Sequence, residues 1–317
     1  MKAVYYEQHG DAGVLQYGEL PKPEPGPDQV LVKVEAAAVN PIDRRLRSGE
    51  LTEYIQRTFP VVPGWDLSGT IVELGENVTD WKVGDEVCGL AFTWSIQHGT
   101  YAEFCPIDVA SIAPKPSNLS FVEAAALPLV SLTAWQALDE FSGLKSGQTV
   151  LIQAGAGGVG SVAIPMAKHL GAKVYTTTRT ANFDYVTERG ADHPIDYTKE
   201  NYVEVINRLE PDGVDCVVEA LLGDDIMKDA IRMTKDGGSV PFLNNEPPEM
   251  PEIASRNIKT EFIHHRADGE MLKMLMTLFE NGTLPSPKVT TMALSEAKKA
   301  HEQSESMSTN GKLVLTL

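Results

Sequence analysis

The fold of this chain is decided by the stretch Ala154-Gly155-Ala156-Gly157-Gly158-Val159-Gly160, which directly follows the apolar run Thr149-Val150-Leu151-Ile152-Gln153. A helical pattern comes next, with apolar residues on one face at Val159, Val162, Ala163, Met166, Ala167 and Leu170. Small residues here let the chain turn sharply, let backbone N–H groups approach a pyrophosphate and let the helix pack closely on the strand. The order of strand, loop and helix therefore predicts a dinucleotide site with its phosphates at the positive end of the helix. A glycine-rich turn without a ligand is the alternative.

Strands and helices continue to alternate beyond this loop. Further strands are expected at 173–177, 214–219 and 238–243, which is typical of βαβ units on a parallel, doubly wound sheet of the Rossmann type. Pro165 lies inside the helix after the loop, and because an interior proline removes a backbone hydrogen bond we expect a kink there. Helices at 270–280 and 294–305 and a strand at 312–317 end the chain. We expect this last part to pack on the first domain.

The segment after the second strand of this domain indicates which cofactor is bound. An NAD site usually has an acidic residue about 20 residues after the glycine loop, where it binds the ribose 2′-hydroxyl. The segment 175–180 has no acid but contains several threonines and Arg179. An arginine fork suits a 2′-phosphate, so the sequence favours NADPH. A solvated surface arginine is the alternative.

The first 120 residues have a different pattern. Short strands are expected at 30–34, 69–73 and 85–89, and turns rich in proline and glycine, such as 21–27, separate them. This pattern predicts a compact, barrel-like β domain.

Composition excludes several classes of protein. The net charge of −17 over 317 residues argues against nucleic acid or an anionic membrane as a partner. Three scattered cysteines without a CxxC pair form neither a disulfide framework nor a cysteine zinc site. No window reaches the ~18 apolar residues of a membrane span, and no stretch resembles a signal peptide, so we expect a cytoplasmic protein.

Six short motifs carry a resemblance to a known family. In chain order they are Asn40-Pro41-Ile42-Asp43, Pro63-Gly64-Trp65-Asp66-Leu67-Ser68-Gly69, Val83-Gly84-Asp85-Glu86-Val87, Gly99-Thr100-Tyr101-Ala102-Glu103-Phe104, Ala126-Leu127-Pro128 with Leu132-Thr133-Ala134-Trp135, and Gly311-Lys312-Leu313-Val314-Leu315. Together they resemble the zinc-independent quinone oxidoreductases of the medium-chain dehydrogenase/reductase superfamily. The resemblance implies a GroES-like β domain, 1–122 and 267–317, around a Rossmann domain, 123–266. It also implies a homodimer.

Zinc is not expected. In zinc enzymes of this superfamily one ligand is a cysteine near the position of Asn40, and another is a histidine where this chain has Trp65. Asp66 alone makes no site, since a catalytic zinc needs about three protein ligands; we read it as a structural turn residue. His264 and His265 would point to opposite faces of a strand, which favours surface or packing roles.

Without zinc, the expected reaction is transfer of hydride from NADPH to an acceptor that is already electrophilic, namely a quinone or an α,β-unsaturated carbonyl compound. An enoyl-thioester reductase of the same fold is one alternative, and an NADPH-binding protein without turnover is another. A hydrogen-bond donor would stabilise the oxyanion that forms. The resemblance suggests Asn40 or Tyr54, although a turn-capping asparagine and an exposed loop tyrosine are the competing interpretations.

The expected cofactor-binding residues come from the glycine loop and from the resemblance. They are Thr133, Ala156, Gly157, Gly158, Val159, Gly160, Thr178, Arg179, Tyr197 and Asn244. Many quinone oxidoreductases have a lysine at the position of Asn182, and Arg179 would have to replace it.

Overall fold

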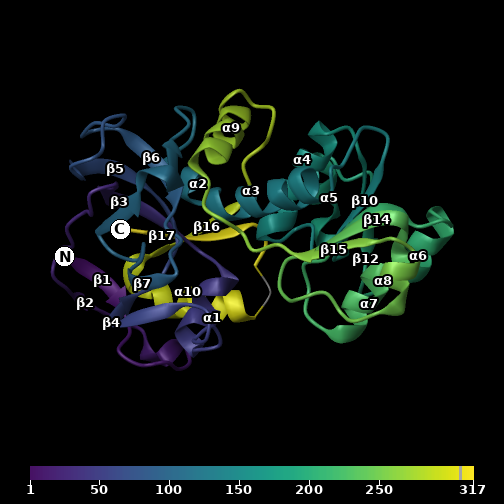
Figure 1. The fold of residues 1–317 in the computed structure, drawn as a ribbon, viewed down its shortest axis with the longest axis horizontal. Coiled ribbons are helices and arrows are strands. Elements are labelled where there is room, and N and C mark those ends of the chain that lie inside the picture. Colours follow the sequence, from purple (N-terminus) through teal and green to yellow (C-terminus); the bar gives the residue numbers. More distant parts are fainter. Residues whose placement is uncertain (307–308) are drawn as a thin grey trace. The chain divides into compact units, whose positions relative to one another are not determined.

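A computed structural model describes residues 1–306 and 309–317 and divides the chain into two compact units (Figure 1). The first unit comprises 1–129, 266–282 and 286–317, and the second comprises 130–265 and 283–285. The boundary at 129/130 falls later than the expected 122/123, because helix α2 (Phe121–Ala125) packs on strands of the first unit.

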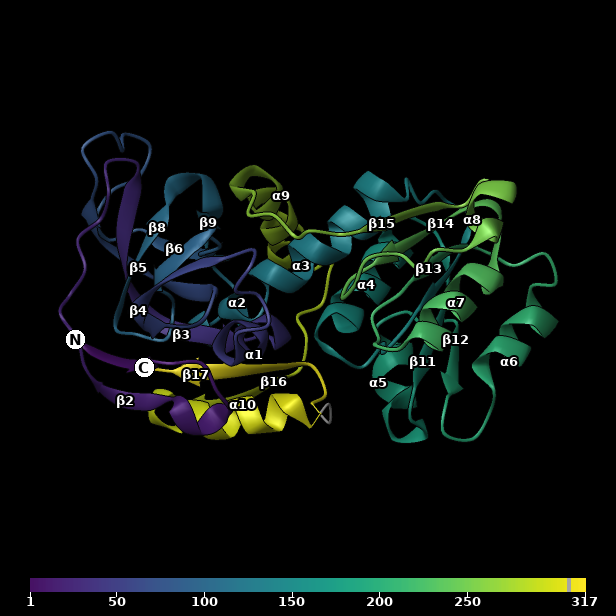
Figure 2. The ribbon, with the colours of Figure 1, turned by 60° about the horizontal axis from the view of Figure 1, so that its bottom comes forward.

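The first unit is built on a mainly antiparallel sheet whose strand order is β16-β17-β3-β5-β6-β9, with β8 also pairing β3 (Figure 2). Only β16 and β17 pair in parallel among these described strands. Its strands are β3 (Gln29–Val39), β5 (Asp66–Leu74), β6 (Glu86–Leu90), β8 (Phe104–Asp108), β9 (Ile112–Pro114), β16 (Val289–Ala293) and β17 (Lys312–Thr316). Smaller pairs are β1 (Lys2–Tyr5) with β2 (Gln16–Glu19), and β4 (Gln56–Val62) with β7 (Ser95–His98). The expected strands at 30–34 and 69–73 lie within β3 and β5.

The end of the chain completes this sheet, as expected. Strand β17 pairs antiparallel with β3, so that Leu315 lies opposite Ala37. Helices α1 (Pro41–Ser48), α9 (Gly269–Glu280) and α10 (Ala297–Glu305) belong to the same unit. The core is a cluster of buried side chains from both ends of the sequence, including Val32, Leu67 and Leu313.

The second unit has a parallel sheet with the order β12-β11-β10-β13-β14-β15. The strands are β10 (Thr149–Ile152), β11 (Lys173–Thr178), β12 (His193–Asp196), β13 (Val214–Val218), β14 (Thr234–Phe242) and β15 (Lys259–Phe262). Its helices are α3 (Pro128–Trp135), which begins in the first unit, then a π-helix (Gln136–Phe141), α4 (Gly158–His169), α5 (Phe183–Glu188), α6 (Tyr202–Leu209), α7 (Asp224–Met233) and α8 (Pro251–Ser255).

The order of these strands defines the position of a ligand site. Numbered along the unit, the order is 3-2-1-4-5-6, so it reverses between β10 and β13. Doubly wound sheets bind dinucleotides outside the carboxyl ends of the strands at such a reversal. The expected Rossmann sheet is therefore present, and its switch point lies between β10 and β13.

Helix α4 follows β10 and continues as an α-helix from Gly158 to His169, across Pro165. Its apolar face is buried, as the spacing of Val162, Ala163, Met166 and Ala167 predicts. Within residues 1–306 and 309–317, no helix is both long and apolar enough to cross a bilayer.

Candidate functional site

The glycine loop lies between β10 and α4, at the carboxyl edge of the parallel sheet. A Cβ on Gly160 would lie 2.4 Å from the carbonyl oxygen of Ala154, and one on Gly155 would lie 2.0 Å from Oγ1 of Thr176. Only glycine fits at either position, so strand, loop and helix approach as closely as a dinucleotide-binding turn requires. Gly157 is the N-cap of α4, and the first turn of the helix contains no acidic side chain. This cradle fits a pyrophosphate at the helix N-terminus.

Strand β11 holds the loop in place. The backbone N–H of Gly155 donates to the carbonyl of Thr177 over 3.0 Å, and the N–H of Ala154 donates to Oγ1 of the same residue over 3.1 Å. Thr176 donates through Oγ1 to the carbonyl of Ile152 over 2.7 Å. Thr176 and Thr177 therefore hold the strand end and the glycine loop in place.

The carboxyl ends of β11 and β12 bring together the residues expected around the 2′-phosphate. Nε of Arg179 donates to the hydroxyl of Tyr197 over 3.1 Å, and both side chains are exposed. Thr178 is buried and accepts at Oγ1 from Asn182 over 3.3 Å. Arg179 and Tyr197 thus lie side by side at the carboxyl edge of the sheet, and their contact with a 2′-phosphate stays a prediction.

Asp196 and Lys199 complete this corner, and the sequence reasoning missed both. Asp196 accepts from the backbone N–H groups of Thr180 and Thr198 over 2.8 and 3.0 Å, and from both hydroxyls. These hydrogen bonds hold the pKa of Asp196 well below its usual range, and those from the two threonine hydroxyls contribute most. Nζ of Lys199 donates to Oγ1 of Thr180 over 2.7 Å. Lys199 therefore places a second cation against the turn that begins at Arg179. Its position just after the third strand of the parallel sheet is the sequence feature that could have identified it.

The remaining cofactor candidates belong to the same unit. Thr133 lies in α3 and is 4% exposed. Asn244 follows the carboxyl end of β14 and is half-buried. Ala156 and Val159 flank the glycines of the loop. Their contacts with a cofactor stay predictions.

Asn40 occupies the N-cap position of α1 in the first unit, but its side-chain amide is only 1% exposed and is bound at both ends. Nδ2 donates to Oδ2 of Asp66 over 2.9 Å, and Nζ of Lys312 donates to Oδ1 of Asn40. The ammonium of Lys312 also lies 3.3 Å from Oδ2 of Asp66. The amide orientation is thereby set, because a lysine can only donate and a carboxylate only accepts.

Asp66 is a buried strand residue rather than a turn residue. It begins β5, pairs with Lys312 and accepts at Oδ1 from the backbone N–H of Leu129 over 2.8 Å. Burial of both charges makes this pair costly to break from one side. The expectation of a turn residue is therefore wrong, and Asp66 instead links β5 to Leu129 and to Lys312.

Asp43 lies beside this cluster and is fully buried. Its Oδ2 accepts from the N–H of Asn40 over 2.8 Å and from the hydroxyl of Tyr101 over 3.0 Å, while its Oδ1 is buried without a partner in the described residues. Burial raises the pKa of Asp43 to about 7, against the opposing effect of these hydrogen bonds. Tyr101 is itself fully buried, so it is a core residue.

Tyr54, the other expected donor, is 71% exposed in the loop between α1 and β4. The structure therefore does not bring Tyr54 into the polar cluster around Asn40. Trp94 is 60% exposed, and its ring packs edge-on against Phe92 with centroids 4.9 Å apart.

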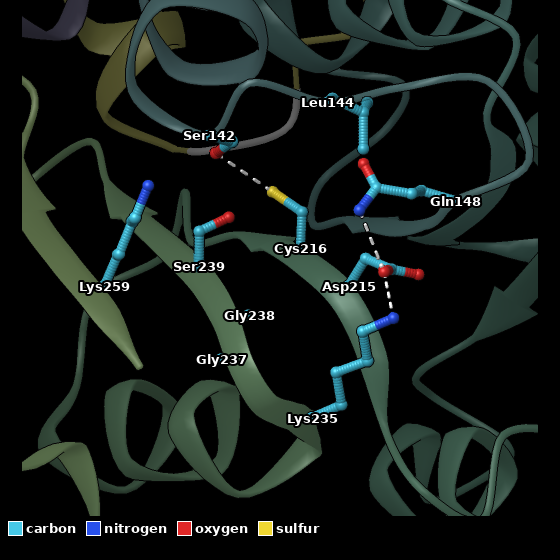
Figure 3. Close-up of a pocket in the computed structure, with 10 residues that line it drawn as sticks. All are labelled: Ser142, Leu144, Gln148, Asp215, Cys216, Lys235, Gly237, Gly238, Ser239 and Lys259. Carbon is cyan, nitrogen blue, oxygen red and sulfur yellow. Dashed lines mark hydrogen bonds and ion pairs between the residues drawn. The ribbon is translucent and has the colours of Figure 1, made fainter. Parts of the chain in front are cut away.

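A small cavity of about 70 Å³ lies at the opposite edge of the parallel sheet, beside the amino ends of β10 and β13 (Figure 3). There Asp215 pairs with Lys235 and accepts from Nε2 of Gln148 over 3.0 Å. Sγ of Cys216 lies 3.4 Å from Oγ of Ser142, and burial raises the pKa of this thiol to about 11. The thiol is thus protonated at neutral pH, and this edge is not where a doubly wound sheet binds its cofactor.

No group of three or more His, Cys, Asp or Glu side chains that could hold a metal ion occurs in the described part of the chain. Of the two adjacent histidines, His264 lies at the surface, with its Nε2 3.7 Å from Oε1 of Glu246. Burial lowers the pKa of His265 to about 4.

A parallel sheet with a glycine cradle at its switch point, together with a mainly antiparallel β domain, is typical of two-domain, dinucleotide-dependent oxidoreductases. Comparison with known proteins gives the family. Residues 26–117 match the family model described as alcohol dehydrogenase GroES-like domain, and residues 189–315 match the one described as zinc-binding dehydrogenase. The chain belongs to the quinone oxidoreductase-like group of the medium-chain dehydrogenase/reductase superfamily.

Individual relatives agree with this assignment. The chain is 38% identical to 2-methylene-furan-3-one reductase of Solanum lycopersicum, over 89% of this chain and 70% of that protein. It is 36% identical to the chloroplastic NADPH-dependent alkenal/one oxidoreductase of Arabidopsis thaliana, with the same coverage. The structure of the quinone oxidoreductase from Coxiella burnetii superposes with a TM-score of 0.89 at 33% identity, covering 100% of this chain and 99% of that one.

Proposed function

We propose that this chain is an NADPH-dependent reductase that transfers hydride to quinones or α,β-unsaturated carbonyl compounds without zinc. The observation that carries the proposal is the glycine cradle at the switch point, where Gly160 leaves no room for a Cβ. The names of the relatives, which include an alkenal/one oxidoreductase and a quinone oxidoreductase, support the acceptor class.

The chain's residues have separable tasks in this reaction. When bound, NADPH supplies the hydride. The glycine loop and the first turn of α4 receive the pyrophosphate, while Arg179 and Lys199 provide two cations for the 2′-phosphate. Both cations are exposed at the carboxyl edge of the sheet, where an incoming phosphate can reach them.

Reduction of a quinone or enone creates an oxyanion, which a hydrogen-bond donor stabilises. Asn40 is our first candidate, because Asp66 uses one of its two Nδ2 hydrogens and Lys312 polarises the amide through Oδ1. Tyr54 is the second candidate, since its exposed hydroxyl is free to approach a ligand.

The proposal is tested by following NADPH and NADH oxidation by the purified protein. The acceptor panel contains ortho-quinones, para-quinones, enals, enones and one enoyl thioester, each with EDTA present. Turnover of quinones or enones with NADPH that survives chelation supports the proposal. Turnover confined to the thioester supports the enoyl-thioester reductase instead. NADPH binding without any turnover would overturn the proposal and favour a non-catalytic binding protein.

A homodimer and a cytoplasmic location are also proposed, the homodimer from the resemblance to quinone oxidoreductases. Strand β15 is one of the two edge strands of the described parallel sheet and offers a place for pairing between two copies. Light scattering of the purified protein tests the dimer, and cell fractionation tests the location.

A further inference from the structure

Two polar side chains lie at the carboxyl ends of the strands that form the switch point. Gln153 directly follows β10, and Glu219 directly follows β13. The two strands are neighbours, and the N–H of Gln153 donates to the carbonyl of Val218 over 3.2 Å. Both side chains are completely buried. They therefore lie at the carboxyl ends of the two switch-point strands, the position at which doubly wound sheets bind a dinucleotide.

Each side chain uses one of its two polar atoms to hold the loop after β13. Oε1 of Gln153 accepts from the N–H of Ala220 over 3.2 Å, and Oε1 of Glu219 accepts from the N–H of Leu221 over 2.8 Å. In the described residues, Nε2 of Gln153 and Oε2 of Glu219 have no hydrogen-bond partner. Buried polar atoms without a partner are uncommon and call for an explanation.

We propose that Glu219 is a specificity-determining residue for the redox state of the cofactor, its ionised carboxylate favouring the oxidised form, NADP⁺, over NADPH. The inference rests on the proposed function, because it requires that the chain bind this cofactor. The physical reason is charge: the nicotinamide ring is positive when oxidised and neutral when reduced. A carboxylate buried beneath the switch point interacts with that added charge through protein rather than through water, which strengthens the attraction.

The charge on Glu219 changes near neutral pH. Burial raises the pKa of its carboxyl to about 7, while the hydrogen bond from the N–H of Leu221 opposes the shift. Tyr202 at the start of α6 also faces this carboxyl, and burial raises the pKa of the Tyr202 hydroxyl to about 12, with Asp229 and Glu219 adding to the shift. Tyr202 therefore stays neutral where Glu219 titrates. Gln153, at the end of the neighbouring strand, carries no charge.

The direction of the effect follows from these groups. Below pH 7 the carboxyl is protonated and does not distinguish the two redox forms. As pH rises through 7 it ionises, and NADP⁺ gains affinity relative to NADPH. The 2′-phosphate of the cofactor titrates in the same range, but it is present in both forms and cancels in the ratio of their dissociation constants.

The test measures the dissociation constants of NADPH, by its fluorescence, and of NADP⁺, by competition, as a function of pH. In the native protein the ratio Kd(NADPH)/Kd(NADP⁺) should rise by roughly tenfold across about two pH units centred on 7. In Glu219→Gln, whose Oε1 can still accept from Leu221, the ratio should stay at its low-pH value. Glu249→Gln, which removes an exposed carboxyl of the same unit, should behave as the native protein.

A second measurement needs no variant. Calorimetry near pH 7 in two buffers of different ionisation enthalpy counts the protons released on binding, and NADP⁺ should release more than NADPH. A native ratio that does not change with pH, or the same pH dependence in Glu219→Gln, would overturn the inference and leave the proposed function intact. Failure of the native protein to bind either form would overturn the proposed function itself.

Discussion

Arg189 replaces the hydrogen bond that Pro165 removes from helix α4. In a regular helix the N–H of residue 165 would donate to the carbonyl of residue 161, but proline has no N–H. Nε of Arg189 donates to that carbonyl of Ser161 instead, and Nη2 donates to the carbonyl of Pro285 over 2.8 Å. Arg189 is only 7% exposed. The helix behind the glycine loop thus continues past a proline because a side chain from α5's end satisfies its free carbonyl.

This relationship predicts coupling between the two positions. Arg189→Met should lower the free energy of unfolding by about 2–3 kcal/mol, because it removes the donor to the buried carbonyl of Ser161 and to the carbonyl of Pro285. In a Pro165→Ala background the same change should cost about 1 kcal/mol less, since the introduced alanine supplies the missing N–H. Chemical denaturation of the four proteins of the cycle measures the coupling. Arg208→Met, at an exposed arginine of α6, is the control and should change little; equal costs in both backgrounds would contradict the idea.

The sequence predicted the parts of this molecule that depend on local pattern. The glycine loop, the strands around it and the buried face of α4 follow from spacing within a few residues. Pro165 was visible as an anomaly, but its compensating donor is 28 positions away from the carbonyl that it satisfies. Likewise, Lys312 lies 272 positions after Asn40 and donates to its side-chain oxygen, a contact that no local pattern indicates. Contacts of such separation are decided by tertiary packing and leave no local signal.

Gly160 should tolerate no side chain. In Gly160→Ala the new Cβ would lie 2.4 Å from the Ala154 carbonyl oxygen and 2.6 Å from Cα of Gly155. Both are backbone atoms, so the loop must move, and we expect a loss of about 1–3 kcal/mol in unfolding free energy together with weaker NADPH binding. Thermal unfolding and fluorescence titration measure the two effects.

Gly157→Ala is the matched variant in the same loop. Its φ of −79° suits any residue, and its Cβ would meet the nearest backbone atom at 3.2 Å. This variant should be closer to the native protein in stability than Gly160→Ala. A Gly160→Ala protein as stable as Gly157→Ala would show that the close approach does not constrain the loop.

Arg179 and Lys199 should determine the preference for the phosphorylated cofactor. Hydrogen bonds to charged groups contribute about 1.5–3 kcal/mol, so Arg179→Gln and Lys199→Gln should each weaken NADPH binding by roughly tenfold or more. NADH, which lacks the 2′-phosphate, should bind almost unchanged. Lys259→Gln, at the amino-terminal edge of the same sheet, provides the control for a general loss of positive charge. If these variants lost affinity for NADPH and for NADH to the same extent, Arg179 and Lys199 would not bind the 2′-phosphate.

The buried carboxyl of Asp43 should make the stability of the protein depend on pH. Its pKa is raised from 3.8 to about 7, chiefly by burial, so between these values the folded protein holds a proton that the unfolded chain has lost. Stability falls with pH wherever the folded state binds more protons. The contribution of Asp43 is therefore fully present below about pH 4 and is lost as pH rises through 7.

In Asp43→Asn, whose side-chain oxygen can still accept from Tyr101 and from the N–H of Asn40, this component of the pH dependence should disappear. Denaturation from about pH 4 to 8 measures the difference in unfolding free energy between the native protein and this variant, and that difference should change by a few kcal/mol over the range. Asp108→Asn, which alters an exposed carboxyl of the same unit, is the control and should show no such trend. A constant difference for Asp43→Asn would mean that Asp43 is ionised in the folded protein, with the nearby ammonium of Lys312 offsetting the cost of its burial.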